Sequence, residues 1–451
     1  MERYDVVVIG GGPGGLAAAK GAREAGAERV LLLERERQLG GILNQCIHDG
    51  FGLHRYKAML TGPEYALLAR TEAQEAGVRL RTGAMVTGLS RSRIVTAVTR
   101  GGVYTYMAGA VVLATGCRER TRGAIAIPGS RPAGIYTAGT AQNLLNTKNL
   151  MVGKRVVILG SGDIGLIMAR RLTLEGAQVL AVAEAKEAPG GLERNVSQCL
   201  YDFGIPLYLN CTVTNIFGTG RLSGVELSDL DQEGKPIPGT QRHLDCDTLL
   251  LSVGLIPENE VGAMAGVALD PATNGTLTDV YLQTTIPGIF SCGNCRKVMD
   301  LADFVTTQGL AAGRNAARFL QKQSLKLMPR DSNTNLPKGL PQPGVVTCVL
   351  CPRGCRVRLR PDGMAKGNAC EKGEAYARQE ATAPLRLLTT TMKRQDGTLL
   401  PVKSSRPLPR ERLLPCAARL REITLPEGSV PCGRIVLDDP FGMGVDILAA
   451  Q

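Results

Sequence analysis

The sequence predicts an α/β fold in which two similar units precede a smaller α+β tail, and three observations support this prediction. An apolar run, the glycine pattern G-x-G-x-x-G, a second apolar run and an acidic residue follow one another twice, about 150 residues apart. The interval from the first glycine to the acid is 24 residues in both copies. Four cysteines crowd together near the C-terminal end. The repeated order of strand, glycine turn, helix, strand and acid is typical of two Rossmann-like dinucleotide-binding domains.

The first copy begins at the apolar run 6–9 and ends at Glu34. It predicts strands near 4–9 and 29–34 on either side of a helix that starts at Gly14. In such a unit the glycines allow a tight turn, close approach of the backbone to a pyrophosphate, and close packing of helix on strand. The pyrophosphate lies at the helix N-terminus, and the acid accepts hydrogen bonds from a ribose. The binding residues expected in this copy are Gly10, Gly12, Pro13, Gly14, Gly15 and Glu34.

The second copy begins at the apolar run 156–159 and ends at Glu184. A carboxylate at this position repels a 2′-phosphate, so NAD is the expected ligand and NADP is less favoured, although Lys186 follows closely. For either copy, the alternative is a glycine turn inside an α/β unit that binds no nucleotide. The binding residues expected in this copy are Gly160, Gly162, Asp163, Ile164, Gly165 and Glu184.

Further apolar runs end in small-residue turns, as buried strands do at the edge of a parallel sheet. These runs end near Gly116, Gly254 and Asn294, and helical spacing resumes over 304–320. Residues 40–52 are too rich in glycine for a regular element and predict a loop. The further residues expected at the nucleotide sites are Gly40, Gly41, Ala114, Thr115, Gly116, Gly254, Gly293 and Asn294.

These elements divide the chain into four parts. Residues 1–117 and 250–320 are expected to form one discontinuous domain, into which 118–249 is inserted as a second domain. Both are expected to have the three-layer ββα arrangement. Residues 321–344 are polar, contain four prolines and predict a linker, and 345–451 predict a small Cys-rich α+β domain.

The composition excludes several classes of protein. A chain of 451 residues is too long for one ordinary core. Its first residues enter a strand without a basic and then apolar leader, so no secretory signal is expected. No apolar run reaches the length of a membrane span, so a cytoplasmic location is expected. The net charge of +12 is concentrated after Gln321, where aromatic residues are sparse, so nucleic acid is not an expected partner. A solvated basic face and a face that docks onto an acidic partner protein both explain this charge.

The residues quoted above resemble those of the pyridine-nucleotide-dependent flavoprotein superfamily over about residues 1–320. The resemblance implies that the first domain binds FAD and that the inserted domain binds NAD. It also implies that the turn at Gly293 and Asn294 contacts the ribityl chain and pyrophosphate of the flavin. The superfamily has Asp where this chain has Asn294, and an amide still hydrogen-bonds to a hydroxyl but carries no charge.

Three segments, 40–52, 131–142 and 300–308, are similar to one branch of this superfamily. The branch contains the flavoprotein subunits of hydrogen cyanide synthase, opine oxidases and dye-linked proline dehydrogenases. It also contains subunits associated with glycerol-3-phosphate-dehydrogenase-like proteins. The resemblance therefore implies a hetero-oligomer in which the partner is a dehydrogenase-like flavoprotein subunit.

The cysteines depart from the pattern of the superfamily's disulfide reductases, which carry C-x4-C after the second Gly-Gly or C-x2-C in the NAD domain. This chain has Cys46 alone at the first place, and the cysteines of its inserted domain lie far apart, so a dithiol relay is not expected. Gln45, Cys46 and His48 are candidates for groups close to the flavin. A buried structural thiol and an ordinary loop histidine are the open alternatives. Cys292 and Cys295 are expected to be structural, because a metal there would compete with the flavin.

The cysteines near the C-terminal end follow the pattern C-x2-C-x3-C-x14-C. Three thiolates on one tight loop and a more distant fourth suit a [4Fe–4S] cluster or tetrahedral zinc. The segment resembles the iron–sulfur module of molybdopterin oxidoreductases, where a lysine follows the last cysteine as Lys372 does here. It also looks like a small uncharacterised bacterial domain. A [4Fe–4S] cluster is therefore the prediction, with zinc or unligated thiols as alternatives, and the predicted ligands are Cys348, Cys351, Cys355 and Cys370.

These features predict an FAD- and NAD(P)-dependent oxidoreductase subunit that passes electrons between NAD(H), FAD and an iron–sulfur cluster. No general base for an organic substrate is evident in the sequence, so a partner subunit is expected to oxidise the substrate. By resemblance, that partner is a glycerol-3-phosphate- or amino-acid-dehydrogenase-like flavoprotein. Two alternatives stay open: a self-sufficient flavin-dependent amine or hydroxy-acid dehydrogenase, and a nucleotide-binding scaffold subunit with a zinc-stabilised tail.

Overall fold

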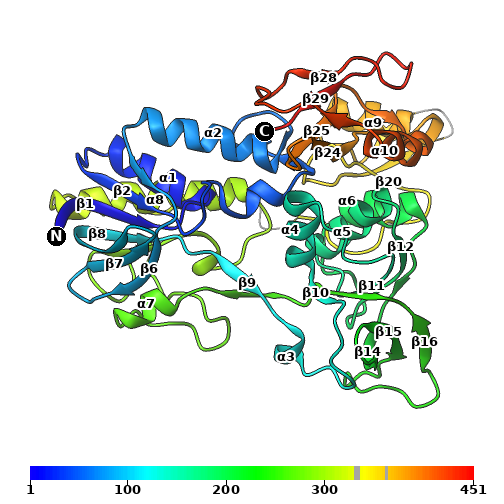
Figure 1. Ribbon diagram of the computed structural model, residues 1–451, viewed down its shortest axis with the longest axis horizontal. Coiled ribbons are helices and arrows are strands. Elements are labelled where there is room, and N and C mark those ends of the chain that lie inside the picture. The colour runs from blue at the N-terminus through cyan, green and yellow to red at the C-terminus, as the bar shows by residue number, and fades with distance from the viewer. Residues whose placement is uncertain (330–335, 361–363) are drawn as a thin grey trace. The chain divides into compact units, whose positions relative to one another are not determined.

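The computed structural model describes residues 1–329, 336–360 and 364–451, which form two compact units (Figure 1). No helix in these ranges is both long enough and apolar enough to cross a bilayer. The first unit comprises Met1–Cys46, Phe51–Arg118 and Leu255–Ser332, and the second comprises Ile47–Gly50, Glu119–Gly254 and Asn333–Gln451.

A seven-stranded sheet forms the centre of the first unit. In spatial order it consists of β5 (Arg79–Arg81), β2 (Val30–Leu33), β1 (Glu2–Ile9), β8 (Gly102–Leu113), β7 (Ile94–Thr99) and β6 (Met85–Leu89), with β19 (Ile289–Ser291) beside β8. The strands β5, β2, β1, β8 and β19 run parallel, whereas β8, β7 and β6 form an antiparallel meander. All four residues of β2 are buried, which is the pattern of a parallel strand that is covered on both faces.

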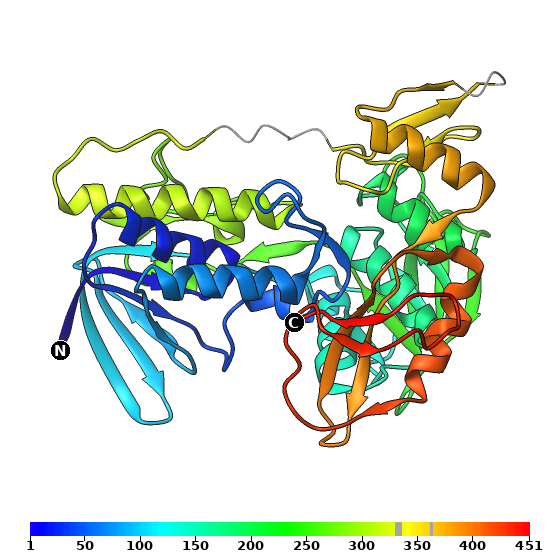
Figure 2. The same ribbon diagram turned by 90° about the horizontal axis from the view of Figure 1, so that it is seen from above.

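The two faces of this sheet pack against different layers. The helical layer consists of α1 (Pro13–Glu24), α2 (Gly62–Glu75) and α8 (Ala302–Leu320). Val6 and Val8 of β1 belong to the core under these helices, and Val7 and Ile9 belong to the core on the opposite face, with residues of the meander. The helices α1 and α8 lie side by side in both ribbon views (Figures 1 and 2). The first unit thus has the expected three-layer ββα arrangement.

The segment after β2 differs from the irregular loop that the sequence predicts over 40–52. It contains a short 3₁₀-helix, η1 (Gly41–Gln45), and a short strand, β3 (Asp49–Phe51). Gly40 and Gly41 have φ values of +117° and +55°, a region that only glycine adopts readily. The glycines therefore turn the chain at the start of the segment, and regular structure follows the turn.

The second unit contains a five-stranded parallel sheet with the same layering. Its strands, in spatial order, are β10 (Ile135–Thr137), β17 (Thr248–Leu251), β11 (Arg155–Leu159), β12 (Gln178–Ala183) and β13 (Leu207–Tyr208). The layers on its two faces are the helices α4 (Ala138–Lys148), α5 (Asp163–Leu174) and α6 (Glu193–Cys199), and the antiparallel strands β14 (Cys211–Gly218), β15 (Leu222–Asp229) and β16 (Arg242–Asp245). Ile158 belongs to the core on the helical side, and Val157 and Leu159 belong to the core on the other side.

The described part of the tail continues the second unit with three small sheets, one of which is only the pair β23 (Leu385–Arg386) and β26 (Leu408–Pro409) (Figure 2). The other two are larger. The first sheet has β20 (Val346–Thr347), β21 (Arg356–Leu359) and β22 (Ala365–Lys366), which contact α9 (Glu371–Thr382). The second has β27 (Thr424–Leu425), β24 (Thr389–Arg394), β25 (Leu399–Ser404), β29 (Ile447–Ala449) and β28 (Ile435–Leu437), and α10 (Leu413–Arg421) contacts β24. Leu174, the last residue of α5, belongs to the same apolar core as Leu388 and Leu420 of the tail.

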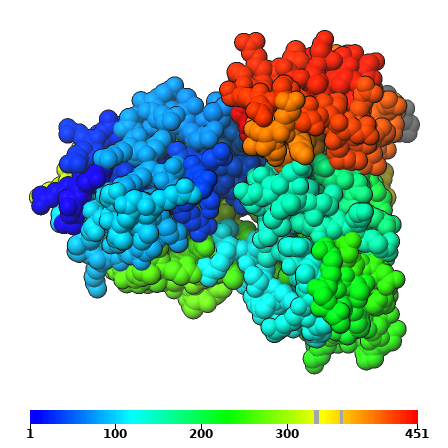
Figure 3. Space-filling model, in the orientation of Figure 1, coloured from blue at the N-terminus to red at the C-terminus, as the bar shows by residue number. Residues whose placement is uncertain are grey.

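Polar contacts also join the tail to the rest of the second unit. The buried Arg171 of α5 donates hydrogen bonds to the hydroxyls of Thr390 (3.2 Å) and Thr391 (3.1 Å), and Arg386 forms an ion pair with Asp202 (2.6 Å). In the space-filling view the orange and red tail adjoins the teal residues of this unit (Figure 3). The domain boundaries expected from the sequence stay a prediction; the compact units add that the tail packs with 119–254. Part of the expected linker, 330–335, lies outside the described residues.

Candidate functional site

The first glycine turn forms a cradle where β1 and β8 end. Gly10 has φ +108°, and a Cβ on it would lie 2.3 Å from the carbonyl oxygen of Ala114. A Cβ on Gly15 would lie 1.8 Å from the carbonyl oxygen of Gly10, so the start of α1 approaches β1 as closely as glycine allows. By contrast, nothing lies within 4 Å of a Cβ built on Gly12, which precedes Pro13 at the N-terminus of α1. The open space at a helix N-terminus fits a pyrophosphate.

The acid at the end of β2 is held in place by backbone groups of the same cradle. Glu34 is 6% exposed, and its carboxylate accepts hydrogen bonds from the backbone N–H groups of Gly11 (2.6 Å) and Glu36 (2.8 Å). The N–H of Gly40 in turn donates to the carbonyl of Gly11 (2.8 Å), and Gly41 approaches Gly12. Two carboxylate oxygens have further lone pairs for ribose hydroxyls. The residues of the first unit therefore fit the adenosine half of FAD.

The other residues expected at this cradle come to the same edge of the sheet. Thr115 follows β8, and its hydroxyl donates to the carbonyl of Glu258 (2.6 Å). Gly293 follows β19, and its N–H donates to the side-chain oxygen of Gln308 (3.2 Å). The amide of Asn294 is oriented by two contacts: its oxygen accepts from the N–H of Met299 (3.1 Å), and its nitrogen lies 3.6 Å from the sulfur of Cys117.

The second glycine turn repeats this geometry where β11 and β17 end. Gly160 has φ +94°, and a Cβ on it would lie 2.2 Å from the carbonyl oxygen of Ser252. A Cβ on Gly165 would lie 2.8 Å from the carbonyl oxygen of Gly160, and the N–H of Gly165 donates to the hydroxyl of Ser252 (3.2 Å). Ile164 is half-buried against the helical core. Gly254 has φ +106° and accepts a backbone hydrogen bond from Arg120 (3.0 Å), in the segment after β17.

The acid of the second copy is held by more groups than the first. Glu184 accepts hydrogen bonds from the N–H (2.9 Å) and the hydroxyl (2.6 Å) of Ser161 and from the N–H of Lys186 (3.1 Å). It is 8% exposed. The arrangement matches that of Glu34 and Gly11, so the second unit fits a dinucleotide by the same criteria as the first.

Sequence reasoning missed a second glycine pair, Gly190 and Gly191, that covers the second turn. The N–H of Gly191 donates to the carbonyl of Ser161 (2.8 Å), and the N–H of Gly190 donates to its hydroxyl (3.0 Å). Asp163 accepts from the N–H of Leu192 (2.7 Å), so the segment closes over the start of α5. A signal was present, because Gly190 follows Gly160 by 30 residues, as Gly40 follows Gly10.

The three candidates for groups near the flavin have different surroundings. Gln45 ends η1 and is buried, and burial raises the pKa of the Cys46 thiol to about 12. Burial also lowers the pKa of His48, and its Nδ1 lies 3.0 Å from the carbonyl oxygen of Asp49. Gln45 and Cys46 belong to the first unit, whereas His48 groups with the second.

The structure brings no pair of cysteines together as a disulfide among the described residues. Cys292 and Cys295 are buried, and their thiols lie 3.8 Å and 3.4 Å from the carbonyl oxygen of Leu113. Thiols that donate weakly to a strand carbonyl, within an apolar core, have a structural role.

Three of the four clustered cysteines, Cys348, Cys351 and Cys355, lie between β20 and β21 of a small hairpin, and the fourth, Cys370, follows the hairpin. The backbone N–H of Cys348 donates to the carbonyl of Cys355 (2.8 Å), the N–H of Gly354 donates to the carbonyl of Cys351 (3.2 Å), and Cys370 is the N-cap of α9. Burial, together with smaller contributions from the charges of the other three cysteines, raises the pKa of Cys348 to about 11. In the part of the chain that the structure describes, no three Cys, His, Asp or Glu side chains are grouped closely enough to hold a metal ion. The metal site therefore stays a prediction.

A buried carboxylate fastens this hairpin to the segment that covers the second glycine turn. Glu193 is fully buried, and it accepts hydrogen bonds from the hydroxyl of Thr347 (2.6 Å) and from the guanidinium of Arg356 (2.5 and 2.7 Å). Thr347 and Arg356 are the direct neighbours of Cys348 and Cys355 in the sequence. The cysteine segment is thus anchored three residues from Gly190, beside the second nucleotide cradle.

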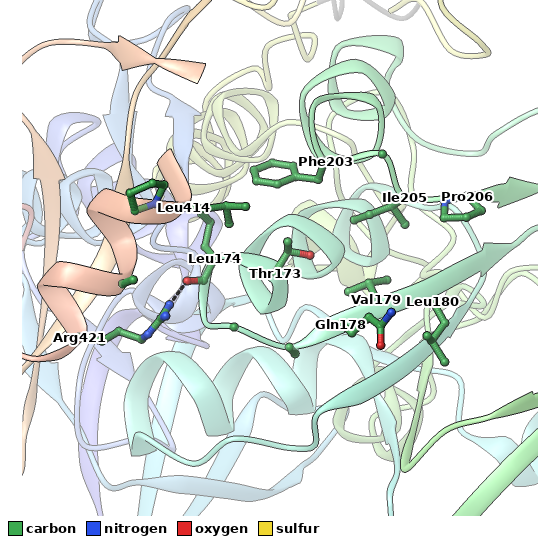
Figure 4. Close-up of a pocket in the computed structure, with 15 residues that line it drawn as sticks. Thr173, Leu174, Gln178, Val179, Leu180, Phe203, Ile205, Pro206, Leu414 and Arg421 are labelled. Carbon is green, nitrogen blue, oxygen red and sulfur yellow. Dashed lines mark hydrogen bonds between the residues drawn. The ribbon is translucent and has the colours of Figure 1, made fainter. Parts of the chain in front are cut away.

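A pocket of about 790 Å³ lies elsewhere in the second unit, where α10 meets the end of α5 (Figure 4). Leu174, Phe203 and Leu414 supply apolar walls, and Arg421 donates a hydrogen bond to the carbonyl of Leu174. None of the residues expected to bind a nucleotide or a metal lines this pocket. It belongs to the attachment of the tail.

Comparison with known proteins agrees with the two cradles. Residues 4–309 match the family described as pyridine nucleotide-disulphide oxidoreductase, and residues 371–451 match a protein family of unknown function, DUF1667. An opine oxidase subunit of Agrobacterium tumefaciens (strain Ach5) is 26% identical over 310 residues. The match covers 64% of this chain and 61% of that relative, so the chain spans about three fifths of the relative's length.

Two thioredoxin reductases are similar over the same region. That of Treponema pallidum (strain Nichols) is 26% identical over 325 residues, which cover 70% of this chain and 97% of the relative. The crystal structure of the Lactococcus lactis enzyme is 22% identical, covers 71% of this chain and 99% of its own, and superposes with a TM-score of 0.59, so it has the same fold. The chain therefore belongs to the pyridine nucleotide-disulphide oxidoreductase family and is an FAD- and NAD(P)-dependent oxidoreductase.

Proposed function

We propose that this chain is the electron-carrying subunit of a multi-subunit dehydrogenase in the cytoplasm. It would pass electrons between NAD(H), FAD and a [4Fe–4S] cluster held by Cys348, Cys351, Cys355 and Cys370. The attachment of the cysteine hairpin to the second nucleotide cradle through Glu193 is the observation that carries this proposal. It keeps a thiol-rich segment within one compact unit with a dinucleotide site.

The residues of the two cradles have separate tasks in this function. When bound, FAD takes up a hydride from a nicotinamide and releases electrons singly. The N-terminus of α1 and Glu34 would bind the FAD pyrophosphate and ribose, and the N-terminus of α5 and Glu184 would bind those of NAD. A carboxylate at position 184 disfavours the 2′-phosphate of NADP.

Disulfide reduction is not supported as the activity of this chain, although relatives are thioredoxin reductases. A redox-active cysteine needs a thiolate and a partner thiol. The raised pKa of Cys46 keeps its thiol protonated at neutral pH, and Cys292 and Cys295 lie in apolar cores. Similarity to the opine oxidase relative, itself one component of an oxidase, favours a hetero-oligomer instead, with a dehydrogenase-like flavoprotein partner that oxidises the organic substrate.

The test is anaerobic purification of the full chain, followed by flavin, iron and labile-sulfide analysis and by identification of co-purifying proteins. We expect FAD, iron and sulfide in the wild-type protein, flavin bleaching by NADH, and loss of iron in Cys351→Ser and Cys370→Ser. Cys432→Ser, an exposed cysteine of the same tail, is the matched control and should keep its iron. Flavin that NADH bleaches in a protein without iron or sulfide would overturn the relay and leave the family assignment intact. Zinc in place of iron would select the scaffold alternative for the tail.

One observation favours a second candidate, a self-sufficient amine or hydroxy-acid dehydrogenase. A carbonyl oxygen only accepts, so the contact between Nδ1 of His48 and the carbonyl of Asp49 places a proton on Nδ1. The lowered pKa of His48 keeps that ring neutral at physiological pH. A neutral imidazole is the form that accepts a proton from an amine or alcohol. Turnover of the isolated chain with proline or glycerol 3-phosphate, abolished in His48→Gln, would select this candidate.

A further inference from the structure

Arg194 is a buried cation without a partner in the described part of the chain. It follows Glu193 in α6 and is 4% exposed. No hydrogen bond or ion pair within the described ranges reaches its guanidinium, and its Nε is buried with no acceptor. The two other buried arginines of this unit are both paired: Arg171 with Glu175, and Arg386 with Asp202.

The groups around Arg194 do not supply the missing negative charge. Its guanidinium faces Gly50, where a Cβ would lie 3.4 Å from Nη2 and 3.5 Å from Nη1. Arg170 lies close enough that both arginines lower the pKa of His48. Asp49, the acid on the same segment as Gly50, forms no ion pair with Arg194 among the described contacts.

The remaining titratable groups nearby are either neutral or already engaged. Burial raises the pKa of Cys199 to about 12, so this thiol carries no charge at neutral pH. Asp163 accepts from the N–H of Leu192 and the side chain of Asn195, and Asp202 pairs with Arg386. Within the described ranges, no carboxylate forms an ion pair with Arg194.

A guanidinium cannot lose its proton in a protein, so burial without a counter-ion is costly unless an anion completes the site. Its planar fork of N–H donors matches the two oxygens of a carboxylate or phosphate. The backbone of Gly50 faces this fork, and a side chain there would contact it. We propose that Arg194, assisted by the charge of Arg170, is a binding site for the carboxylate or phosphate group of a ligand.

Two sources supply this chemistry. One is the pyrophosphate of the dinucleotide in the second cradle, because Arg194 lies on the segment that closes over Ser161. The other is a separate small anionic metabolite, bound beside His48. In both cases the guanidinium would bind two oxygen atoms of an anionic group. The experiment shows which of the two ligands carries that group.

The test is thermal unfolding of the full chain in an anion-poor buffer, with inorganic phosphate, acetate or NAD⁺ added. Wild type is compared with Arg194→Met and with Arg155→Met, an exposed arginine of β11 that gives the same change of charge. We expect phosphate or acetate to raise the unfolding midpoint of wild type and of Arg155→Met. In Arg194→Met the apparent affinity should fall about 10- to 100-fold, whereas the midpoint without anion should be equal to or above that of wild type.

The NAD⁺ titration distinguishes the sources. Loss of the NAD⁺ response in Arg194→Met assigns the site to the pyrophosphate, and an unchanged NAD⁺ response assigns it to a separate ligand. Arg194→Lys keeps the charge but loses the fork, and it should bind phosphate and acetate about tenfold more weakly than wild type. Equal stabilisation of wild type and Arg194→Met by these anions, or a midpoint of Arg194→Met that falls well below wild type without anion, overturns the proposal. So does anion binding by Arg194→Lys that equals wild type.

Discussion

In the first unit, Gly11 contacts Glu34 and Gly40 through its backbone alone, whereas in the second unit Ser161 adds a hydroxyl to the same two contacts. The two copies differ further after the glycine pair that contacts each turn, which is 40–41 in the first unit and 190–191 in the second. The third residue after Gly40 is Leu43, which lies in the apolar core, and the third residue after Gly190 is Glu193, which holds Thr347 and Arg356 of the tail. The same backbone arrangement is thus surrounded by different side chains in the two units.

The difference separates what the repeated skeleton determines from what individual side chains determine. Glycines at fixed intervals bring strand, helix and acid together in both units, and this geometry creates the nucleotide cradle. The residues that follow this glycine pair have different contacts in the two units. In the second unit they are charged and buried, and they connect the cradle to another part of the chain.

The largest expected effect comes from breaking the buried ion pair that has no counterpart in the first unit. Arg356→Met leaves the fully buried Glu193 without its cation, and should lower the free energy of unfolding by about 3 to 5 kcal/mol. Glu193→Leu copies the residue of the first unit and leaves Arg356, which is 40% exposed, able to reach water, so it should cost about 1 kcal/mol. Urea denaturation of both single variants and of the double variant measures how far the two losses of unfolding free energy differ. Equal losses in the two single variants would contradict it.

Glycine-to-alanine substitution compares the helix–strand contacts of the two copies. Gly15→Ala puts a methyl group 1.8 Å from the backbone oxygen of Gly10, so we expect a loss of about 3 kcal/mol and a protein without flavin. Gly165→Ala meets the oxygen of Gly160 and Cβ of Ser252 at 2.8 Å, which a smaller shift relieves, so about 1 to 2 kcal/mol is expected. Thermal unfolding and flavin content are the measurements. Retention of flavin by Gly15→Ala would show that α1 can move away from β1.

Alkaline pH should destabilise both units through buried thiols. Burial raises the pKa of Cys46 in the first unit and of Cys199 in the second to about 12. Because the folded-state pKa lies above the unfolded-state value, the stability is complete below about pH 8.5 and falls as the pH rises toward 12. At about pH 10 each thiol should cost about 2 kcal/mol relative to neutral pH.

Unfolding midpoints measured from about pH 8 to about pH 10 test this dependence. Cys46→Ala and Cys199→Ala should each show a shallower decline than wild type, although both are less stable at neutral pH. A decline that is unchanged in Cys199→Ala would mean that this thiol ionises in the folded protein.

The smallest expected effect on stability belongs to Gly12→Ala, where the first cradle is open. The glycine has φ −73°, and no atom lies within 4 Å of the added methyl group, so the unfolding midpoint of the flavin-free protein should not change. The methyl group would instead occupy the space expected for the pyrophosphate, and FAD should bind about tenfold more weakly. Equilibrium dialysis measures the affinity, with Gly88→Ala as the control for folding, because a Cβ on this glycine of β6 would make only an ordinary contact, 3.5 Å from Cβ of Thr96. Unchanged FAD affinity would place the pyrophosphate elsewhere.

The spacing of glycines and acids was sufficient to predict the parts of the cradles that are local in sequence. The strands of the first copy and a helix start at Gly14, observed at Pro13, follow from short-range patterns, and so does the place of Glu34 and Glu184 after the second strand of each copy. The pair Gly190 and Gly191 was predictable in principle from its interval. The regular structure after Gly41 was not expected, because glycine content predicts turns and does not show where they end.

The contacts of the tail could not be predicted from the sequence. Glu193 and Arg356 are 163 residues apart, and an isolated glutamate in a polar stretch gives no sign that it will be fully buried. The core that Leu174 shares with Leu388 was equally unpredictable, since each residue alone fits an ordinary amphipathic pattern. The missing partner of Arg194 is likewise visible only when the surroundings of each charge are known.

The core that joins the tail to α5 also bears on how this protein can be cut and recombined. Removal of the tail exposes Leu174, takes two hydroxyl partners from Arg171 and leaves Asp202 without its arginine partners, so a shortened chain should aggregate through a newly exposed apolar surface. A chimera that takes its tail from a relative should therefore take residues 119–254 from the same relative. In protein engineering, the interchangeable module is the second unit as a whole.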